Sequence, residues 1–302
     1  MARVNRLIEL LEQDQPTFGA RAPVLTHEAG LAAAQTPYDY LIVEFEHQPF
    51  DMIGLRAFLR GLVDGGPTRG GHRTPPVVAT LPATGVSADA VRANAWQIAH
   101  LLAAGVHGLI LCHAETADAA GALVAHARYP LNTPGADDAS VGRRGGGGQA
   151  DAAAIWGLPV AEYLAKADPW PLNPAGELLL AVKIENRRGL AACEAITAVP
   201  GIGMAEWGPG DMGMSLAPRY LQAGYEPDPD YAHDPPYGAA MEASRRRVRD
   251  ACAANGVALY STMRQADWRE LYALGVRSSS VTAQTDGFIA ELRRLAGRTM
   301  PW

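Results

Sequence analysis

Eight short, strongly apolar segments recur along the chain, and an amphipathic stretch of helical length follows most of them. We expect these segments to be β-strands at residues 17–20, 40–43, 77–81, 108–112, 178–184, 202–206, 257–260 and 276–281. Helical patterns cover residues 52–62, 88–104, 117–126, 189–195, 239–254 and 265–274, and a leading amphipathic helix includes residues 7–12. Strands that alternate with helices in this way are typical of a parallel sheet with crossover helices.

The number of these units predicts the fold class. Eight strand–helix units in 302 residues, with no linker-like boundary, predict one (β/α)8 TIM barrel that spans residues 1–302. The rival fold is an open, doubly wound sheet, which often carries a glycine-rich nucleotide loop after its first strand. Residues 18–23 lack the G-x-G-x-x-G pattern of such a loop, so the barrel is favoured.

Two long insertions interrupt the pattern, after the fourth and the sixth predicted strands. Residues 130–170 include the glycine-rich run 141–149, which favours neither helix nor strand, so we expect an irregular insertion. It is either a surface loop or a segment that covers a substrate or contacts another subunit. The second insertion, at residues 218–237, is acidic and rich in proline, and we expect it at the active face.

Composition excludes several classes of partner. The chain has 26 basic and 32 acidic residues, and its pI near 5.8 argues against a nucleic-acid surface. No apolar run approaches the roughly 20 residues of a membrane-spanning helix. The first residues lack the apolar core of a secretory signal, so we expect a cytoplasmic protein. Only two of the basic residues are lysines, Lys166 and Lys183, which makes each of them notable.

Ionisable residues gather where three of the predicted strands end, and barrel enzymes carry their catalytic residues at such ends. Lys183 and Glu185 share one face of the fifth strand, because side chains alternate along a strand. The sixth strand leads into residues 207–211, a tight turn that presents Asp211. The second strand is followed by Glu44-Phe45-Glu46-His47.

These residue types suit a metal site. Two carboxylates on neighbouring strands suit a hard divalent cation that keeps open positions for a substrate, and a nearby histidine suits proton transfer. Spacing alone leaves alternatives open. In these, Glu185 forms an ion pair with Lys183, Asp211 caps a helix that begins near Met212, and His47 is a structural histidine.

Four segments in this order, 38–47, 183–190, 199–203 and 207–213, together resemble the HpcH/HpaI family of metal-dependent class II aldolases. The resemblance covers about residues 5–295 and implies a (β/α)8 barrel that assembles as a homo-oligomer, usually a hexamer of dimers. It implies a divalent metal ion, Mg²⁺ or Mn²⁺ with Co²⁺ as a further candidate, bound by Glu185 and Asp211. In that family the metal acts as a Lewis acid and holds the enolate that forms when a carbon–carbon bond breaks.

The resemblance also implies roles for other residues. His47 matches the catalytic base, and Glu44 stands where the family usually has the aspartate that orients this base. The tight turn after the sixth strand brings backbone amides close to a ligand. The residues that we expect to contact the substrate are Thr80, Lys183, Trp207, Gly208, Pro209 and Gly210.

The chain departs from the family at the end of the third strand. The family usually has an arginine there, in a Pro-Val-Val-Arg pattern, whereas this chain reads Pro76-Val77-Val78-Ala79. Loss of one such oxyanion donor can cost about two to three powers of ten in rate. We expect Lys183 to replace the missing cation, with Arg21 as the second candidate. Lys183 also opens a rival mechanism, in which it forms a Schiff base with the substrate in place of a metal.

The predicted function is a metal-dependent carbon–carbon lyase. It would cleave a 4-hydroxy-2-oxo acid, or a related hydroxy acid, into a small oxo acid such as pyruvate and an aldehyde. One alternative is a related lyase or decarboxylase of a different acid, for example an aromatic one, because the strand-three arginine is missing and Trp207 is present. Another is a barrel that binds a ligand without catalysis, against which the joint presence of His47, Glu185 and Asp211 argues.

Overall fold

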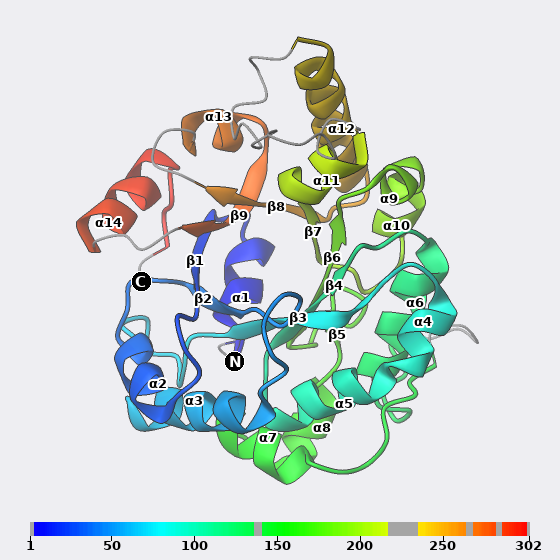
Figure 1. Cartoon of the computed structure of the whole chain (residues 1–302). Coiled ribbons are helices and arrows are strands. Elements are labelled where there is room, and N and C mark those ends of the chain that lie inside the picture. The colour runs from blue at the N-terminus through cyan, green and yellow to red at the C-terminus, as the bar shows by residue number, and fades with distance from the viewer. Residues whose placement is uncertain (1–2, 136–140, 217–234, 264–267, 282–285, 301–302) are drawn as a thin grey trace.

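The structure, a computed structural model, describes residues 3–135, 141–216, 235–263, 268–281 and 286–300 (Figure 1). Its strands are β1 (Thr17–Arg21), β2 (Tyr40–Val43), β3 (Val77–Thr84), β4 (Gly108–Cys112), β5 (Pro169–Trp170), β6 (Leu178–Ile184), β7 (Met204–Trp207), β8 (Ala258–Met263) and β9 (Val276–Val281). Its helices are α1 (Arg6–Glu12), α2 (His27–Ala34), α3 (Met52–Asp64), α4 (Ala88–Ala93), α5 (Ala95–Ala104), α6 (Ala117–Ala127), α7 (Gln149–Trp156), α8 (Val160–Lys166), α9 (Arg187–Ala191), α10 (Cys193–Thr197), α11 (Pro209–Leu216), α12 (Pro235–Ala254), α13 (Trp268–Ala273) and α14 (Asp286–Leu295).

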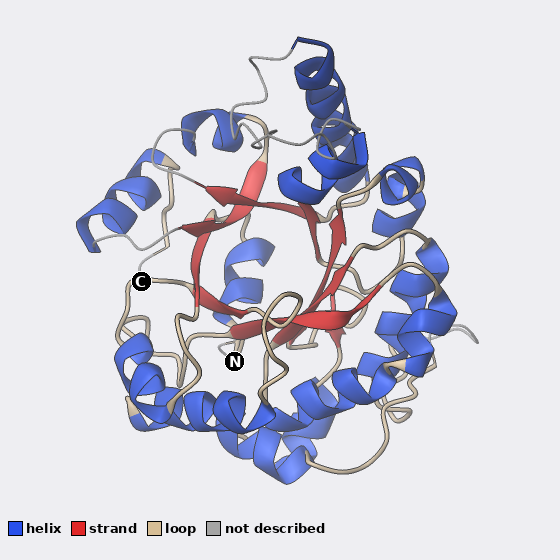
Figure 2. Cartoon of the chain, viewed as in Figure 1, coloured by secondary structure: helices blue, strands red, loops and turns tan. Residues whose placement is uncertain are grey.

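Eight parallel strands form a closed barrel with helices outside it, which confirms the predicted (β/α)8 fold (Figure 2). Strands β1 to β4 and β6 to β9 are neighbours in chain order, and the pairings β4–β6 and β1–β9 close the ring. The two-residue strand β5 pairs with the start of β6. All eight predicted strands are present, although β3 and β8 each extend three residues beyond their expected ends.

Side-chain alternation divides the apolar residues into two layers. The inner layer fills the barrel and includes Tyr40, Ile42, Val78, Ile110, Leu179, Ala181, Met204 and Tyr260. The outer layer packs beneath the helices and includes Val43, Val77, Leu109, Val182 and Ile184. Because the strands are buried on both faces, they form continuous apolar runs in the sequence, and this is why the pattern predicts them.

The leading helix α1 closes one end of the barrel, where Figure 1 shows it inside the ring of strands. The side chain of Asn5 caps this helix by accepting hydrogen bonds from the amides of Leu7 and Ile8. Both of these side chains are fully buried and pack in the inner layer. Full burial of such a side chain contributes about 1.5–3 kcal/mol. The amino-terminal end of the barrel is therefore filled, and the carboxyl-terminal end remains as the place for a site.

The insertion at residues 130–170 is more regular than the sequence suggests. Its glycine run, up to Gly148, forms neither helix nor strand, but α7 and α8 follow directly. Trp156 at the end of α7 stacks on His107, which precedes β4, with ring centroids 5.3 Å apart. The described part of this insertion thus lies at the amino-terminal end of the barrel, because α6 has already returned the chain there.

The second insertion, at residues 218–237, lies outside the described residues up to Pro235, where α12 begins. Within the described ranges, no helix combines the length and the apolar character that crossing a bilayer requires.

Candidate functional site

Glu185 follows β6 directly and is held at the carboxyl-terminal mouth of the barrel. It is only 2% exposed, and its Oε1 accepts a hydrogen bond from the backbone N–H of His113 at 2.8 Å. A Cβ placed on Gly208, after β7, would lie 2.5 Å from its Oε2. Burial raises the pKa of Glu185 above its ordinary value. The carboxylate is thus fixed from two sides, and only a glycine leaves room for it at position 208.

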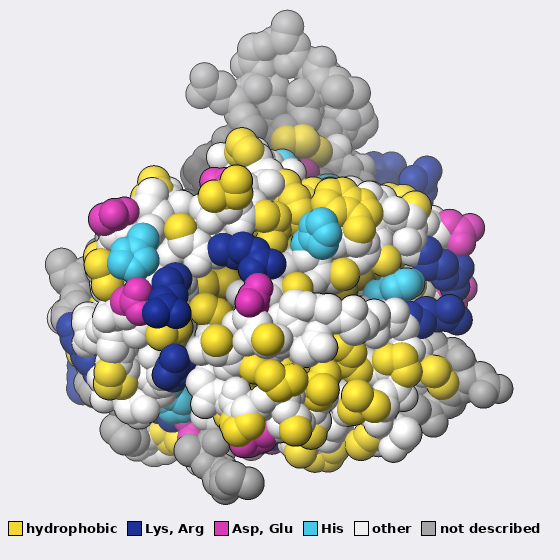
Figure 3. All heavy atoms as spheres, turned by 90° about the horizontal axis from the view of Figure 1, so that it is seen from below, with side chains coloured by type: hydrophobic (Ala, Val, Ile, Leu, Met, Phe, Trp, Pro, Cys, Tyr) yellow, Lys and Arg dark blue, Asp and Glu magenta, His cyan; other side chains and the backbone are white. Residues whose placement is uncertain are grey.

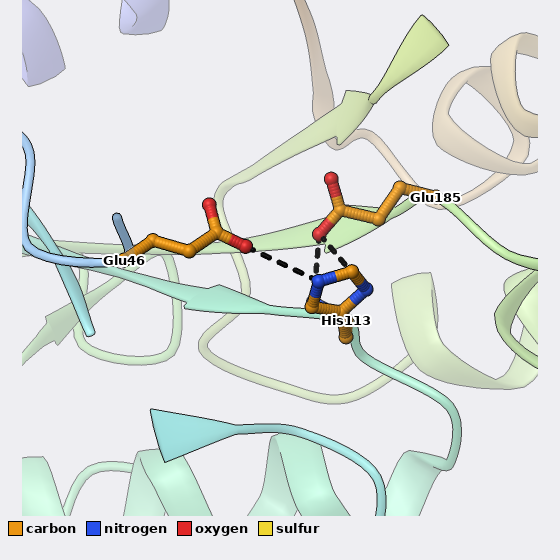
Figure 4. A group of neighbouring side chains, drawn as sticks. All are labelled: Glu46, His113 and Glu185. Atoms are coloured by element: carbon orange, nitrogen blue, oxygen red, sulfur yellow. Dashed lines mark hydrogen bonds and ion pairs between the residues drawn. The ribbon is translucent and has the colours of Figure 1, made fainter. Parts of the chain in front are cut away.

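The imidazole of His113 lies between two carboxylates, as Figure 4 shows. Its Nε2 is 3.3 Å from Oε1 of Glu46, and its Nδ1 is 3.6 Å from Oε1 of Glu185. The hydrogen bond to Glu46 raises the pKa of His113, although burial acts in the opposite direction. The backbone of His113 has a φ of +47°, which few residues other than glycine adopt. Backbone strain of this kind is concentrated at functional sites.

Lys183, the last inward-facing residue of β6, donates a hydrogen bond from Nζ to Oε2 of Glu46. Burial opposes the charge on Lys183, but Glu206, Glu185 and the bond to Glu46 raise its pKa above the ordinary value. Burial likewise opposes the charge on Glu46, yet His113 and Lys183 lower the pKa of Glu46 to about 2. The alternative in which Lys183 pairs with Glu185 is therefore wrong, since its partner is Glu46. A Schiff base needs a neutral amine, so the raised pKa of Lys183 also argues against that rival mechanism.

Among the contacts of the described residues, Glu44 meets the backbone of His47, whose amide donates to its Oε1 at 3.4 Å, and not the ring. Its Oε1 accepts hydrogen bonds from the amide of Glu46 at 2.6 Å and from the hydroxyl of Thr80 at 2.9 Å, so it stabilises the turn after β2. The ring of His47 is 65% exposed, and its Nε2 lies 3.6 Å from Oε2 of Glu46. The predicted pair of Glu44 and His47 is therefore corrected, because the carboxylate that faces the ring is Glu46.

The hydroxyl of Thr80 is fully used within the protein. It accepts hydrogen bonds from the amides of Phe45 at 2.7 Å and Glu46 at 3.1 Å, and it donates one to Glu44. A hydroxyl has one proton and two lone pairs, so no further bond is left for a ligand. Thr80 therefore has no hydrogen bond left to offer a substrate, and it holds the turn that carries Glu46 and His47.

Trp207 lies outside the barrel wall. Its Nε1 donates a hydrogen bond to Oγ of Ser244 in α12 at 3.0 Å, and the residue is 5% exposed. Met204 of the same strand packs in the inner layer, so alternation directs Glu206 inward and Trp207 outward. The prediction that Trp207 contacts the substrate is therefore wrong, and it no longer supports an aromatic substrate.

The remaining predicted residues lie around the mouth. Arg21 ends β1, with a side chain 60% exposed and its Nη1 4.0 Å from Oε2 of Glu44. Helix α11 begins at Pro209, so Asp211 lies in its first turn and does not cap a helix that starts at Met212. The charge of Asp211 raises the pKa of His113, after the bond to Glu46 and the charge of Glu185. Asp211 is not among the three described residues, Glu46, His113 and Glu185, whose ligand atoms lie within 4.8 Å of one another. The first N–H groups of a helix lack partners within it and suit an anion.

Three residues of the site have no assigned role among the sequence predictions: Glu46, which is named there only as an ionisable residue after the second strand, His113 and Glu206. Glu46 and His113 each follow the carboxyl-terminal end of a strand, and this position is the signal that could have identified them. Glu206 pairs in register with Lys183 inside the barrel. Burial raises the pKa of Glu206 to about 7.

The donor atoms at the mouth fit a divalent cation. Glu46, His113 and Glu185 each offer one ligand atom, and these atoms lie within 4.8 Å of one another. Oε1 of Glu46 is buried and, besides the ring of His113, has no hydrogen-bonding partner among the described residues. Carboxylate oxygens are ligands that Mg²⁺ and Mn²⁺ prefer, and imidazole suits transition metals.

No model of a known protein family matches the chain. A hydroxypyruvate/pyruvate aldolase from Pseudomonas aeruginosa is 29% identical over 295 residues, which cover 98% of this chain and 92% of the relative. A 2-keto-3-deoxy-L-rhamnonate aldolase from Klebsiella pneumoniae subsp. pneumoniae is 30% identical over 224 residues, which cover 74% of this chain and 67% of the relative. The crystal structure of an HpcH/HpaI aldolase/citrate lyase family protein from Burkholderia cenocepacia J2315 matches with a TM-score of 0.69 and 25% identity, covering 97% and 98% of the two chains. The chain belongs to the HpcH/HpaI aldolase/citrate lyase family.

Proposed function

We propose that this protein is a divalent-metal-dependent aldolase that cleaves a 4-hydroxy-2-oxo acid into a small oxo acid, such as pyruvate, and an aldehyde. The observation that supports this most strongly is the fixed carboxylate of Glu185, which the amide of His113 and the backbone of Gly208 hold at the barrel mouth. The relatives named as aldolases of hydroxypyruvate, pyruvate and a keto-deoxy sugar acid support the same class of reaction.

Glu185 and Asp211 would hold the metal ion, as the resemblance to the family implies: Glu185 packs against Gly208, and Asp211 follows three residues later in the first turn of α11. Mg²⁺ and Mn²⁺ suit oxygen ligands, and Co²⁺ is a further candidate. When bound, such an ion supplies a Lewis acid that polarises the carbonyl group of a 2-oxo acid.

The chain supplies two groups that suit the negative charge of the substrate. The first turn of α11, which includes Gly210 and Asp211, presents backbone N–H groups without partners in the helix, and these suit a carboxylate. The ammonium group of Lys183 stays protonated between buried carboxylates, because its pKa is raised. It therefore offers a fixed positive charge beside Glu46 at the barrel mouth and would compensate for the arginine that strand β3 lacks.

We assign the proton transfer to His47, as the resemblance to the family implies. Its ring is 65% exposed at the mouth, with Nε2 3.6 Å from Oε2 of Glu46. As a general base it would accept the proton of the 4-hydroxyl group while the bond between carbons 3 and 4 breaks and the aldehyde leaves. Glu46, which stays ionised because its pKa is lowered to about 2, would stabilise the imidazolium that results.

The experiment is an assay of pyruvate release from 4-hydroxy-2-oxopentanoate by protein freed of metal and then supplied with Mn²⁺ or Mg²⁺. We expect release only with metal, and a loss of at least about 10–100-fold in kcat/KM in Glu185→Gln, the range known for loss of a metal ligand's support. Glu194→Gln is the matched control, because Glu194 is an exposed carboxylate paired with Arg247 on the outer helices. Equal release without metal, or by Glu185→Gln, would contradict the proposal.

Association of several copies is a further part of the proposal. Figure 3 shows many apolar side chains on the face seen from below. The exposed apolar side chains of the chain include Ile53 in α3, which is 85% exposed, and Trp96 in α5, which is 49% exposed. Large apolar side chains at a surface are typical of contacts between proteins, and they support a homo-oligomer.

A further inference from the structure

We propose that His113 is a nitrogen ligand of the metal ion, binding it through Nδ1 beside Glu185, while Glu46 fixes the ring through Nε2. This inference rests on the proposed metal-dependent function, and it adds a ligand to the carboxylate pair of Glu185 and Asp211. With this ligand the site offers an imidazole as well as oxygen ligands. The set of metal ions that it prefers changes accordingly.

The first argument is the spacing of the ligand atoms. Nδ1 of His113 lies 3.6 Å from Oε1 of Glu185. Two adjacent ligands of one ion, each bound at about 2.0–2.2 Å, lie about 3–3.5 Å apart. The observed separation is slightly longer than that of two ligands of a shared ion, so a bound ion would draw the two atoms slightly together.

The second argument is the partner of the other ring nitrogen. A histidine that binds a metal commonly donates its remaining N–H to a carboxylate, which fixes the ring and its tautomer. Oε1 of Glu46 lies 3.3 Å from Nε2 of His113, and the other oxygen of this carboxylate accepts a hydrogen bond from Lys183. With the proton on Nε2, the lone pair of Nδ1 faces Glu185 and is available for a metal ion.

The third argument is the backbone, which holds the ring in this place. His113 has a φ of +47°, a conformation that costs free energy for a side chain other than glycine. The residues on both sides are tied to neighbouring strands: the carbonyl of Cys112 accepts a hydrogen bond from the amide of Gly85 at 2.7 Å, and the amide of Ala114 donates one to the carbonyl of Lys183 at 2.9 Å. The turn is therefore fixed at the position that brings the imidazole against Glu185.

The consequence is a preference among metals. Imidazole is a poor ligand for Mg²⁺, whereas first-row transition ions accept it, Mn²⁺ most weakly and Co²⁺ and Zn²⁺ more strongly. Three protein ligands also leave positions open on a six-coordinate ion, enough for the two oxygens of a 2-oxo acid. We expect the protein to bind first-row transition ions in preference to Mg²⁺.

The test is pulsed electron paramagnetic resonance of Mn²⁺ bound to the protein, which detects a directly bound nitrogen through its modulation of the echo. We expect a nitrogen modulation in the wild type that is absent in His113→Asn. Asparagine is chosen because it tolerates a positive φ, so the turn is retained. His47→Asn is the matched control, because it removes a neighbouring imidazole at the mouth and should keep the modulation.

Affinity gives a second readout. We expect His113→Asn to weaken binding of Mn²⁺ and Co²⁺ by about tenfold or more, with a much smaller effect on Mg²⁺. Binding of Mn²⁺ that depends on Glu185 but lacks the nitrogen modulation would overturn this inference and leave the proposed function standing. A wild-type protein that binds no Mn²⁺, Co²⁺ or Mg²⁺ would overturn both.

Discussion

Gly208 lies directly against the carboxylate of Glu185: a Cβ at position 208 would be 2.5 Å from Oε2 and 2.8 Å from Cβ of Glu185. Real Cβ atoms do not approach other heavy atoms so closely, and Glu185 is buried and has little room to move. The glycine of the turn after β7 therefore sets the position of a carboxylate from the neighbouring strand β6.

The first prediction concerns this contact. Gly208→Ala should displace the carboxylate of Glu185 and lower the affinity for Mn²⁺ by about 10–100-fold, the range expected when the support of a metal ligand is lost. Titration calorimetry measures the change. Gly210→Ala is the matched control, because a Cβ at position 210 meets no atom within 4 Å, and its affinity should match that of the wild type. Equal affinities of all three proteins would contradict the role of this contact in placing the carboxylate of Glu185.

A second prediction concerns the chemistry of Lys183. Its raised pKa keeps the ammonium group protonated at neutral pH, and a protonated amine cannot attack a carbonyl group. Treatment with borohydride and pyruvate should therefore leave the mass of the protein unchanged. A reduced adduct on Lys183, seen by mass spectrometry and absent in Lys183→Met, would establish the Schiff-base mechanism in place of metal catalysis.

A third prediction concerns stability. The side chains of Lys183 and Glu46 are 10% and 5% exposed, so removal of the ammonium group leaves a buried carboxylate with fewer partners. Lys183→Met should lower the free energy of unfolding of the metal-free protein by about 3 kcal/mol. The double variant Lys183→Met/Glu46→Gln should recover most of this loss, because the uncompensated charge is gone. Urea denaturation of the three proteins tests this, and a double variant no more stable than the single one would contradict it.

A fourth prediction concerns pH and lies at the other end of the barrel. Burial lowers the pKa of His107 from 6.5 to about 3, and its Nδ1 accepts a hydrogen bond from the amide of Val77 at 3.1 Å. Between pH 6.5 and pH 3 the unfolded chain binds a proton that the folded protein does not bind, so the free energy of unfolding falls as the pH falls. The contribution of His107 should amount to about 2 kcal/mol between pH 7 and pH 5.

The variant His107→Asn separates this contribution from the rest of the protein. Urea denaturation gives the free energy of unfolding at pH 7 and at pH 5. The decrease in this free energy from pH 7 to pH 5 should be smaller by about 2 kcal/mol in His107→Asn than in the wild type. His100 is an exposed histidine of α5, so His100→Asn should keep the wild-type difference. An unchanged difference in His107→Asn would mean that His107 is not the neutral, buried group described above.

The sequence predicts the barrel well, because its strands are buried on both faces. A strand such as Leu178–Ile184 is apolar at almost every position, and only Lys183 interrupts it. The same alternation that directs Lys183 inward also directs Trp207 outward. The motif that contains Trp207 lies at the end of a strand, but the alternation of side chains along that strand turns Trp207 away from the site. Thr80 faces inward as expected, but its three hydrogen bonds depend on the turn after β2 and have no local pattern.

The site is predicted less completely than the fold. Glu185 follows a strand whose direction fixes its place, whereas Glu46 and His113 lie beyond the ends of β2 and β4, where no periodicity applies. The positive φ of His113 depends on hydrogen bonds to two other strands, and a linear pattern does not contain them. Glu44 matched a motif position, but the bonds of its carboxylate to the amide of Glu46 and to Thr80 appear only once β2 and β3 are paired.

The most direct measurement is exchange of the methyl protons of pyruvate with deuterium, followed by nuclear magnetic resonance, because it detects enolate formation without any aldehyde. Protein stripped of metal should catalyse no exchange, and added Mn²⁺ should restore it in the wild type and in Glu194→Gln but not in Glu185→Gln. Exchange that is absent with every metal, in a protein shown to bind one through Glu185, would mean that this barrel does not form the enolate of pyruvate.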